Sequence, residues 1–266
     1  MPIIRPPAVA GMFYPADPEQ LTRDVQQFLL DAPSCNLIPK ALIVPHAGYV
    51  YSGIVAASAY NCLKPIASQI RKVVLLGPTH RVAIRGLALP GADRFETPLG
   101  SIEIDQIGVS ALAHLPQVII HPDAHALEHS LEVQLPFLQM ILDDFTLIPL
   151  AVGMATPEEV AQVLEVLWGG DETLIVISSD LSHFLTYESA QHTDKKSVGA
   201  ILQLQQLVSH EQACGATPIN GLIVAAQQHH LTPHLLDLRN SGDTAGTPDR
   251  VVGYTAFAFT AEDQIR

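Results

Sequence analysis

Short apolar runs alternate with segments of helical period along this chain. Continuous apolar runs that end in glycine, proline or polar residues are typical of buried strands. The runs of this kind are KALIV (residues 40–44), RKVVLLG (71–77), FTLIPLAV (145–152), TLIVIS (173–178), HLLDLRN (234–240) and VVGYTAFAFT (251–260). Residues 86–105 combine short apolar stretches with turn residues, which predicts short antiparallel strands.

The segments between these runs carry helix signals. Asp17 and Thr156 are capping residues, and each precedes a proline at the first helical position, so we expect helices over residues 17–31 and 156–168. We expect further helices at residues 54–64, beginning at Ser52 or Gly53, at 129–142, where Pro136 bends the helix or starts a new turn, at 187–205 and at 218–230.

Strands that alternate with helices predict an α/β fold. We expect a mostly parallel or mixed central sheet with helices on both faces. Because the chain has no low-complexity linker and no internal repeat, we interpret residues 1–266 as a single domain.

Composition limits the functions that remain. The chain is 48% hydrophobic and 15% charged, with a formal net charge of -13, so we expect no nucleic-acid and no membrane partner. We read no signal peptide and no apolar segment long enough to span a membrane. Three cysteines cannot all pair, and we interpret Cys62 as a core residue and Cys35 as incidental. This cysteine usage favours a soluble protein of the reducing cytoplasm.

Polar residues gather where three apolar runs end. His46 follows the first run, His80 follows the second, and Asp180 and His183 follow the run at 173–178. A single polar loop at a strand end needs no functional explanation, because loops are polar by default. Three such loops, each with a histidine or carboxylate, favour a ligand site, since the carboxyl ends of parallel strands meet at one edge of a sheet.

Two histidines from separate strand ends suggest a metal site, which needs at least one more donor. Asp180, His183 and Cys214 are candidates; Cys214 precedes a helix N-terminus, which favours a thiolate, although a buried thiol remains the alternative. His125 and His129 would share one face of a helix, but the order H-A-L-E-H lacks the glutamate position of zinc-protease motifs.

Six blocks of this sequence resemble the Memo family, whose microbial members are also called AmmeMemoRadiSam system protein B. The blocks are AVAGMFYPADPEQL, PHAGYVYSGIVAASAY, VVLLGPTH, LEHSLEVQLPFLQ, SSDLSHF and CGATPI, and they span nearly the whole chain in order. The resemblance implies a fold similar to the catalytic subunit of class III extradiol dioxygenases, which are non-haem iron enzymes.

By position, the resemblance implies that His46, His80 and Cys214 bind a metal. Fe(II) or Cu is the expected ion, with Zn as a further candidate, because cysteine replaces the carboxylate of the dioxygenase site. Asp180 and His183 are then the polar pair beside the metal, with His183 as the proton-transfer group. His129 and Glu132 are expected next to the metal ligands rather than on the metal.

Three functions stay open. The first is a metal-dependent redox enzyme. The second is a binding module for a small molecule or a peptide, with Phe13, Tyr49 and Tyr51 lining the pocket. The third is a metal-free hydrolase that uses Cys214, His183 and Asp180. The family resemblance also implies a functional association with a radical SAM protein.

Overall fold

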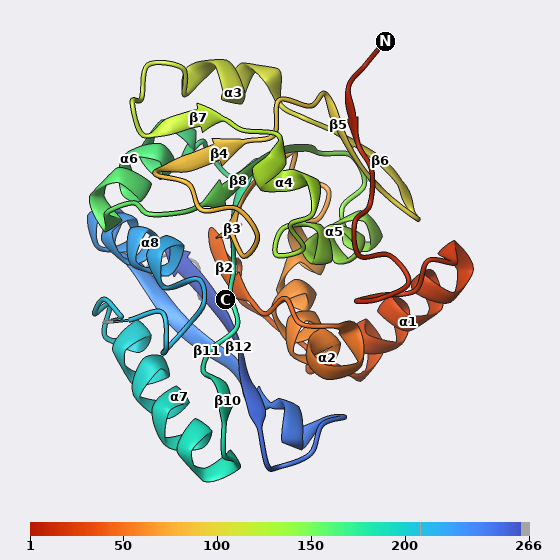
Figure 1. Cartoon of the computed structure of the whole chain (residues 1–266), viewed down its shortest axis with the longest axis vertical. Coiled ribbons are helices and arrows are strands. Elements are labelled where there is room, and N and C mark those ends of the chain that lie inside the picture. Colours follow the sequence, from red (N-terminus) through yellow and green to blue (C-terminus); the bar gives the residue numbers. More distant parts are fainter. Residues whose placement is uncertain (208, 262–266) are drawn as a thin grey trace.

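The computed structural model describes residues 1–207 and 209–261, and within them one nine-stranded mixed sheet forms the centre of the molecule (Figure 1). Eight strands follow the order β10-β12-β2-β9-β3-β8-β4-β7, and β11 pairs with β12. Their bounds are β2 Ala41–Val44, β3 Lys72–Pro78, β4 Leu87–Leu89, β7 Val118–Ile120, β8 Thr146–Val152, β9 Thr173–Ser178, β10 His183–Leu185, β11 Leu231–Asn240 and β12 Val251–Ala261.

The middle of the sheet is parallel. β2 pairs with β9, β9 with β3, and β3 with β8, all in parallel register, whereas β12, β10, β11 and the β4–β8 pair are antiparallel. All four residues of β2 are buried, as are all six of β9, which is why the sequence shows continuous apolar runs rather than alternation. The expectation of an α/β protein with a mixed, mostly parallel sheet is confirmed.

Helices cover both faces of the sheet, and β2 shows how each face is buried. Leu42 and Val44 join one hydrophobic core, while Ala41 and Ile43 point to the other. The first core is covered by α1 (Pro18–Asp31), α2 (Tyr49–Tyr60) and α5 (Leu135–Ile141), and the second by α6 (Pro157–Leu167) and α8 (Ala216–Gln228) (Figure 1). Helix α7 (Tyr187–Leu202) packs against β11 and β12, and α3 (Gln106–Ala111) lies near α6.

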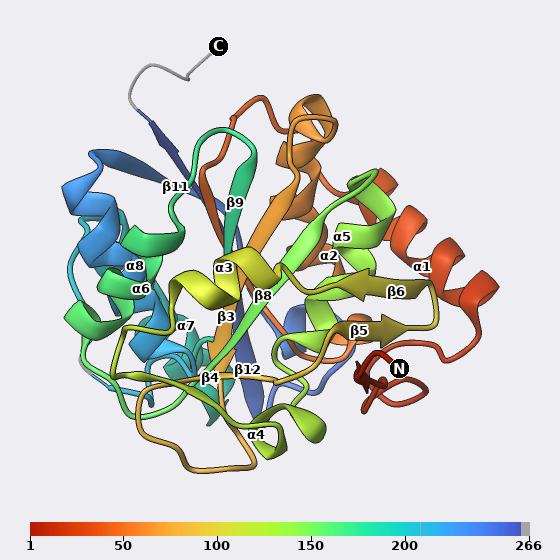
Figure 2. The same cartoon turned by 90° about the horizontal axis from the view of Figure 1, so that it is seen from above.

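A three-stranded sheet attaches the N-terminal arm, residues 1–17 before α1, to the molecule. Its order is β1 (Ile4–Arg5), β5 (Arg94–Thr97) and β6 (Gly100–Glu103). β5 and β6 form the antiparallel pair that the sequence predicts, while β1 adds to β5 in parallel (Figure 2). The arm is hydrogen-bonded to residues 125–132, which include part of α4 (Asp123–Ala126) and the start of the 3-10 turn η2 (Glu132–Gln134).

The capping predictions are confirmed, but two helix starts are wrong. The helix expected from residue 129 is α5, which begins at Leu135 after the 3-10 turn η2. The Asp17 carboxylate accepts a hydrogen bond from the Gln20 N–H, and Thr156 forms a capping box with Glu159. Helix α2 begins at Tyr49 rather than at Ser52 or Gly53. The Tyr49 N–H donates to the Phe13 carbonyl, so the arm holds the first turn of this helix in place.

Cys35 and Cys62 form a disulfide, which corrects the interpretation of Cys35 as incidental, while Cys62 is the buried core residue that the sequence predicts. Cys62 is buried in the 3-10 turn η1 (Asn61–Ile66) after α2, and Cys35 lies in the loop that leads into β2. The argument for a reducing compartment relied on unpaired cysteines and therefore no longer applies.

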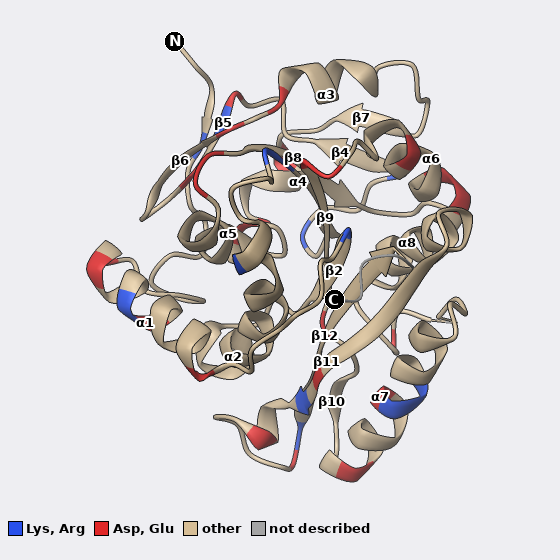
Figure 3. Ribbon diagram, turned by 180° about the vertical axis from the view of Figure 1, so that it is seen from behind, with Lys and Arg blue, Asp and Glu red and all other residues tan. Residues whose placement is uncertain are grey.

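Charged side chains are spread over the surface. Figure 3 shows acidic residues on α1, α6 and α7, and basic residues on α1 and α7. Among the residues that the structure describes, no helix is both long and apolar enough to cross a membrane.

Candidate metal centre

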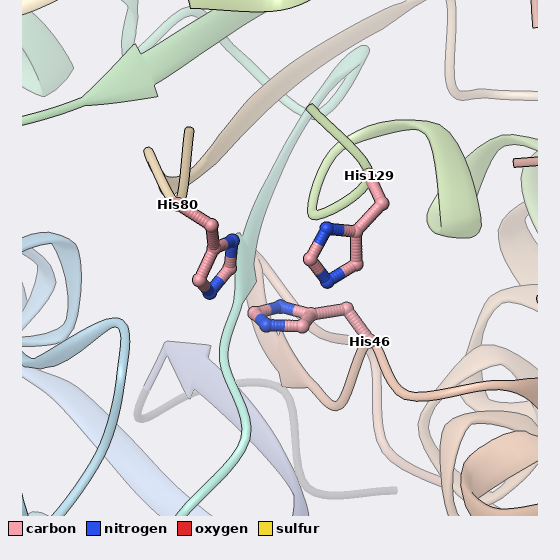
Figure 4. A group of neighbouring side chains, drawn as sticks. All are labelled: His46, His80 and His129. Atoms are coloured by element: carbon pink, nitrogen blue, oxygen red, sulfur yellow. The ribbon is translucent and has the colours of Figure 1, made fainter. Parts of the chain in front are cut away.

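Three histidines meet beyond the carboxyl ends of the central strands. His46 follows β2, His80 follows β3, and His129 comes from the loop between α4 and η2. One ring nitrogen from each of these histidines lies within 4.8 Å of the others, and Figure 4 shows the three rings gathered around a common space. The expectation that His46 and His80 converge is confirmed.

A serine fixes the tautomer of His46. The Ser178 hydroxyl donates to the Ser130 carbonyl at 2.6 Å and lies 2.9 Å from His46 Nδ1. Because the one hydroxyl proton is used, Ser178 must accept from His46 Nδ1–H, and His46 Nε2 carries a lone pair and no proton. Burial, together with the neighbouring His129 and His80, holds the pKa of His46 well below its usual value. His46 is therefore a neutral imidazole whose Nε2 can bind a metal.

The Glu128 carboxylate fixes the orientation of the His80 ring. Glu128 Oε1 lies 2.8 Å from His80 Nδ1, and Oε2 accepts the His80 backbone N–H. Glu128 also accepts the backbone N–H groups of His129 and Ser130. Burial alone would raise the pKa of Glu128, but the bonds from His80 and the backbone lower it to about 2. An ionised Glu128 accepts a hydrogen bond from His80 Nδ1–H, which leaves Nε2 of His80 for a ligand.

His129 is the third histidine of this cluster, whereas the sequence analysis expected it next to the metal ligands rather than on the metal. Its ring stacks on His80 with centroids 4.6 Å apart, and burial lowers its pKa to about 4. The pairing of His129 with His125 on one helix is wrong, because α4 ends at Ala126. His125 Nε2 instead bonds to the Ala88 carbonyl in the core.

Cys214 lies at the edge of the same group. Its Sγ is 3.3 Å from His46 Nε2 and 3.9 Å from the Ser179 hydroxyl. Burial and the nearby Asp180 raise the pKa of this thiol to about 12, so the expected thiolate is wrong for the metal-free protein. The backbone N–H groups near the start of α8 do not offset the loss of solvent.

Asp180 and His183 are near the histidines, but the predicted partnership between them is wrong. The Asp180 carboxylate accepts the His46 backbone N–H at 2.8 Å, and burial raises its pKa to about 7. His183 Nδ1–H donates to the Leu181 carbonyl instead, because residues 179–182 form no helical turn. Asp180 therefore positions the loop that carries His46, while His183 faces the cleft beside His80.

The carboxylate next to the histidines is Glu128, whereas Glu132 has a different position from the one expected. Glu132 is fully buried and binds Arg5, the backbone N–H groups of Ala8 and Val9, and the Tyr14 hydroxyl. It therefore anchors the N-terminal arm. The sequence contained Glu128 within the same LEHSLE block, but its contact with His80 depends on tertiary structure.

The three aromatic residues expected in the pocket have three different environments. Phe13 packs against His129 with ring centroids 4.6 Å apart. Tyr49 is a buried core residue whose hydroxyl donates to the Val133 carbonyl, so its assignment to a pocket is wrong. Tyr51 is exposed on the first turn of α2.

An open cleft of about 810 Å³ leads to the histidines. Its lining comes from the strand ends, from α7 and from the segment before α8, and consists of His80, His183, Leu185, Thr193, Ser209, His210, Glu211, Gln212 and Cys214. A small molecule can therefore approach a metal held by the histidines from this side.

Comparisons with known proteins agree on one family. A family model described as Memo-like protein matches residues 5–258. A MEMO1 family protein of Aquifex aeolicus (strain VF5) is 35% identical over 268 residues, covering 96% of this chain and 99% of that protein. A MEMO1 family protein of Archaeoglobus fulgidus is 36% identical over 273 residues, again covering 96% and 99%.

A solved structure, that of the uncharacterized protein JW3007 from Escherichia coli K12, is similar in fold. It has a TM-score of 0.52 and 13% sequence identity, and the match covers 82% of this chain and 98% of that one. This likeness supports the α/β architecture and gives no information about activity.

Proposed function

The chain belongs to the Memo-like protein family, and we propose that it is a metal-dependent redox enzyme with Fe(II) or Cu at the three histidines. The observation that carries the proposal is the cluster of His46, His80 and His129, in which hydrogen bonds assign the Nδ1 protons of His46 and His80. Such bonds through the second nitrogen are typical of metal-binding histidines.

The donor set fits such an ion. Three imidazole donors suit Fe, Cu and Zn, and the ionised Glu128 behind His80 partly compensates the charge of the ion. Cys214 lies outside the group of three whose ligand atoms are all within 4.8 Å of one another, but its Sγ is 3.3 Å from His46 Nε2. Two donors on one tetrahedral ion are separated by about 3.5 Å, given bonds of about 2.0 and 2.3 Å. We therefore include Cys214 as a ligand that loses its proton when the ion binds.

Fe(II) or Cu would supply one-electron chemistry with oxygen or with a small substrate in the cleft. The side chains of the protein transfer protons and shape the cleft. His183 holds its Nδ1 proton on the Leu181 carbonyl, so its Nε2 is the atom that exchanges protons with a ligand. Leu185 and Thr193 shape the cleft that receives a small molecule or a peptide side chain. We propose a kinship with class III extradiol dioxygenases on the family resemblance, without ring cleavage as a consequence.

The test is metal analysis of anaerobically purified protein, with oxygen uptake measured on the loaded protein. We expect about one Fe or Cu ion per chain, and loss of at least 90% of that metal, roughly a tenfold change, in His46→Ala and in His80→Ala. His192→Ala is the matched control, because His192 is exposed on α7, and it should keep its metal. Protein that takes up no metal would overturn the proposal in favour of a binding module.

The same metal analysis tests whether His129 and Cys214 are the third and fourth donors. We expect His129→Ala and Cys214→Ser each to weaken metal binding, and Cys214→Ser to change the preference among Fe, Cu and Zn, because only the thiolate is a soft donor. An unchanged preference in Cys214→Ser would restrict the site to the three histidines. Metal-free protein whose Cys214 is rapidly alkylated at neutral pH would instead support a hydrolase.

A further inference from the structure

One loop connects all three histidines. In residues 125–130, Glu128 binds His80, His129 is itself a member of the cluster, and the Ser130 carbonyl accepts the Ser178 hydroxyl that fixes His46. The Ser130 hydroxyl also donates to the Pro78 carbonyl just before the His80 loop. A displacement of this loop would therefore disturb each of the three rings.

Arg5 holds this loop through two of its backbone carbonyls. Its Nε and Nη2 donate to the His125 carbonyl at 3.1 and 2.9 Å, and Nη2 also donates to the Glu128 carbonyl at 2.6 Å. Nη1 binds Glu132, and the guanidinium lies over the Phe95 ring at 5.2 Å. Arg5 is 6% exposed and Glu132 is fully buried, so these bonds form away from water.

The remaining bonds of Glu132 keep Arg5 in this position. Glu132 accepts the N–H groups of Ala8 and Val9 and the Tyr14 hydroxyl, all from the N-terminal arm. Phe13 of the same arm packs against the His129 ring. The planar guanidinium of Arg5 is needed because one side chain must bind a carboxylate and two carbonyls at once. The ammonium of a lysine cannot do so with the same geometry.

We propose that Arg5 is a positioning residue of the metal centre, which holds the 125–130 loop so that His46, His80 and His129 keep the geometry and tautomers needed to bind the ion. The inference rests on the proposed metal site. Arg5 touches none of the three rings, and it acts through the backbone carbonyls of residues 125 and 128.

The experiment compares Arg5→Gln and Arg5→Lys with wild type, using Cu(II) and Zn(II) as probes. We expect Arg5→Gln to weaken metal binding by about 10- to 100-fold, as for other residues that orient metal ligands. Arg5→Lys keeps a cation beside Glu132 and should fold even where Arg5→Gln does not, with an intermediate loss of affinity. The Cu(II) EPR signal should broaden in both variants, because the donors no longer occupy one geometry.

Lys72→Gln is the matched control. Lys72 forms a partly buried ion pair with Asp105 at 2.9 Å. It is the first residue of β3, whereas His80 follows the other end of that strand. This change should lower thermal stability while leaving metal affinity and the EPR signal unaltered. If folded Arg5 variants bound metal as wild type does, with the same EPR signal, the positioning role would be overturned.

A second readout does not depend on the metal. Nitrogen-15 NMR of metal-free protein reports which ring nitrogen of His46 and His80 carries the proton. We expect one Nδ1–H tautomer in wild type and in Lys72→Gln, and a mixture in Arg5→Gln and Arg5→Lys. Wild type without metal affinity would overturn the proposed function, whereas unchanged tautomers in both Arg5 variants would overturn the role of Arg5.

Discussion

Single residues at the metal centre divide into those whose position follows from the chain and those whose position does not. His46 and His80 directly follow apolar strands, so their convergence could be predicted from the parallel pairing of those strands. Ser178 and Glu128 fix the two rings, yet each lies more than forty positions away from its histidine in the sequence, with separations of 132 and 48. No local pattern records such contacts, and the same holds for His129.

At the residue scale we predict that His183→Ala keeps its metal. His183 bonds to its own loop through Nδ1 and is not part of the histidine cluster. If it transfers protons in the cleft, its loss should lower oxygen-dependent turnover by about 10²- to 10⁴-fold. Metal content, melting temperature and turnover are measured on the same sample. Loss of the metal in this variant would identify His183 as a ligand, and a fall in melting temperature alone would indicate a structural role.

At the scale of elements, the sequence located most helices and strands because their ends carry local signals. Thr156 with Pro157 and Glu159 defines the start of α6 through bonds between near neighbours. The start of α2 was missed because its first N–H bonds to Phe13 of the arm rather than to a local cap. The H-A-L-E-H segment was misread as a helix because Glu128 bonds to the His80 loop.

The packing of α7 on β12 depends on a buried carboxyl group. The Asp194 carboxyl accepts the Ser182 N–H at 3.1 Å, and it lies so close to Gly253 that a Cβ there would be 2.1 Å from Asp194 Oδ2. Burial raises the pKa of Asp194 to about 6 from its ordinary 3.8. Since the folded state binds this proton more tightly than the unfolded state, the stability from this group is present below pH ~4 and lost as pH rises through ~6.

We therefore predict that Asp194→Asn stabilises the protein above pH ~6 and has little effect near pH ~4. Asparagine keeps an acceptor for the Ser182 N–H and removes the buried charge, so the gain should reach about 2–3 kcal/mol at pH ~8. Urea unfolding of both proteins at the two pH values measures the difference. Asp249→Asn, at an exposed position, is the control and should show no such dependence. An equal effect of Asp194→Asn at both pH values would contradict this account.

For the whole molecule, the alternation of apolar runs and helices sufficed for the fold class, because a chain with buried strands and intervening helices has few other solutions. The antiparallel pairings of β4 and β10 were less predictable, since these strands have three residues each and carry little signal. The Cys35–Cys62 bond was missed for another reason. Three cysteines allow three different pairs, and only the packing of the loop before β2 against η1 selects one of them.

That disulfide leads to a prediction about the stability of the whole chain. It joins residues 27 positions apart. Closing a loop of this length lowers the conformational entropy of the unfolded state and so raises the free energy of unfolding by about 3–4 kcal/mol. Reduction should therefore lower the melting temperature by roughly 5–12 °C for a chain of this size. Asn61 already bonds to the Leu29, Ala32 and Pro33 carbonyls at the same junction, so the fold should persist without the disulfide.

The control is the double variant Cys35→Ala/Cys62→Ala, which should melt near the temperature of the reduced wild type and should not respond to reductant. Thiol titration of denatured, unreduced wild type should find Cys214 alone, because the other two cysteines are paired. Three titratable thiols in the purified protein would mean that the bond does not form under those conditions. A melting temperature that reductant leaves unchanged, with the bond shown to be broken, would mean that Asn61 and the surrounding core hold the junction unaided.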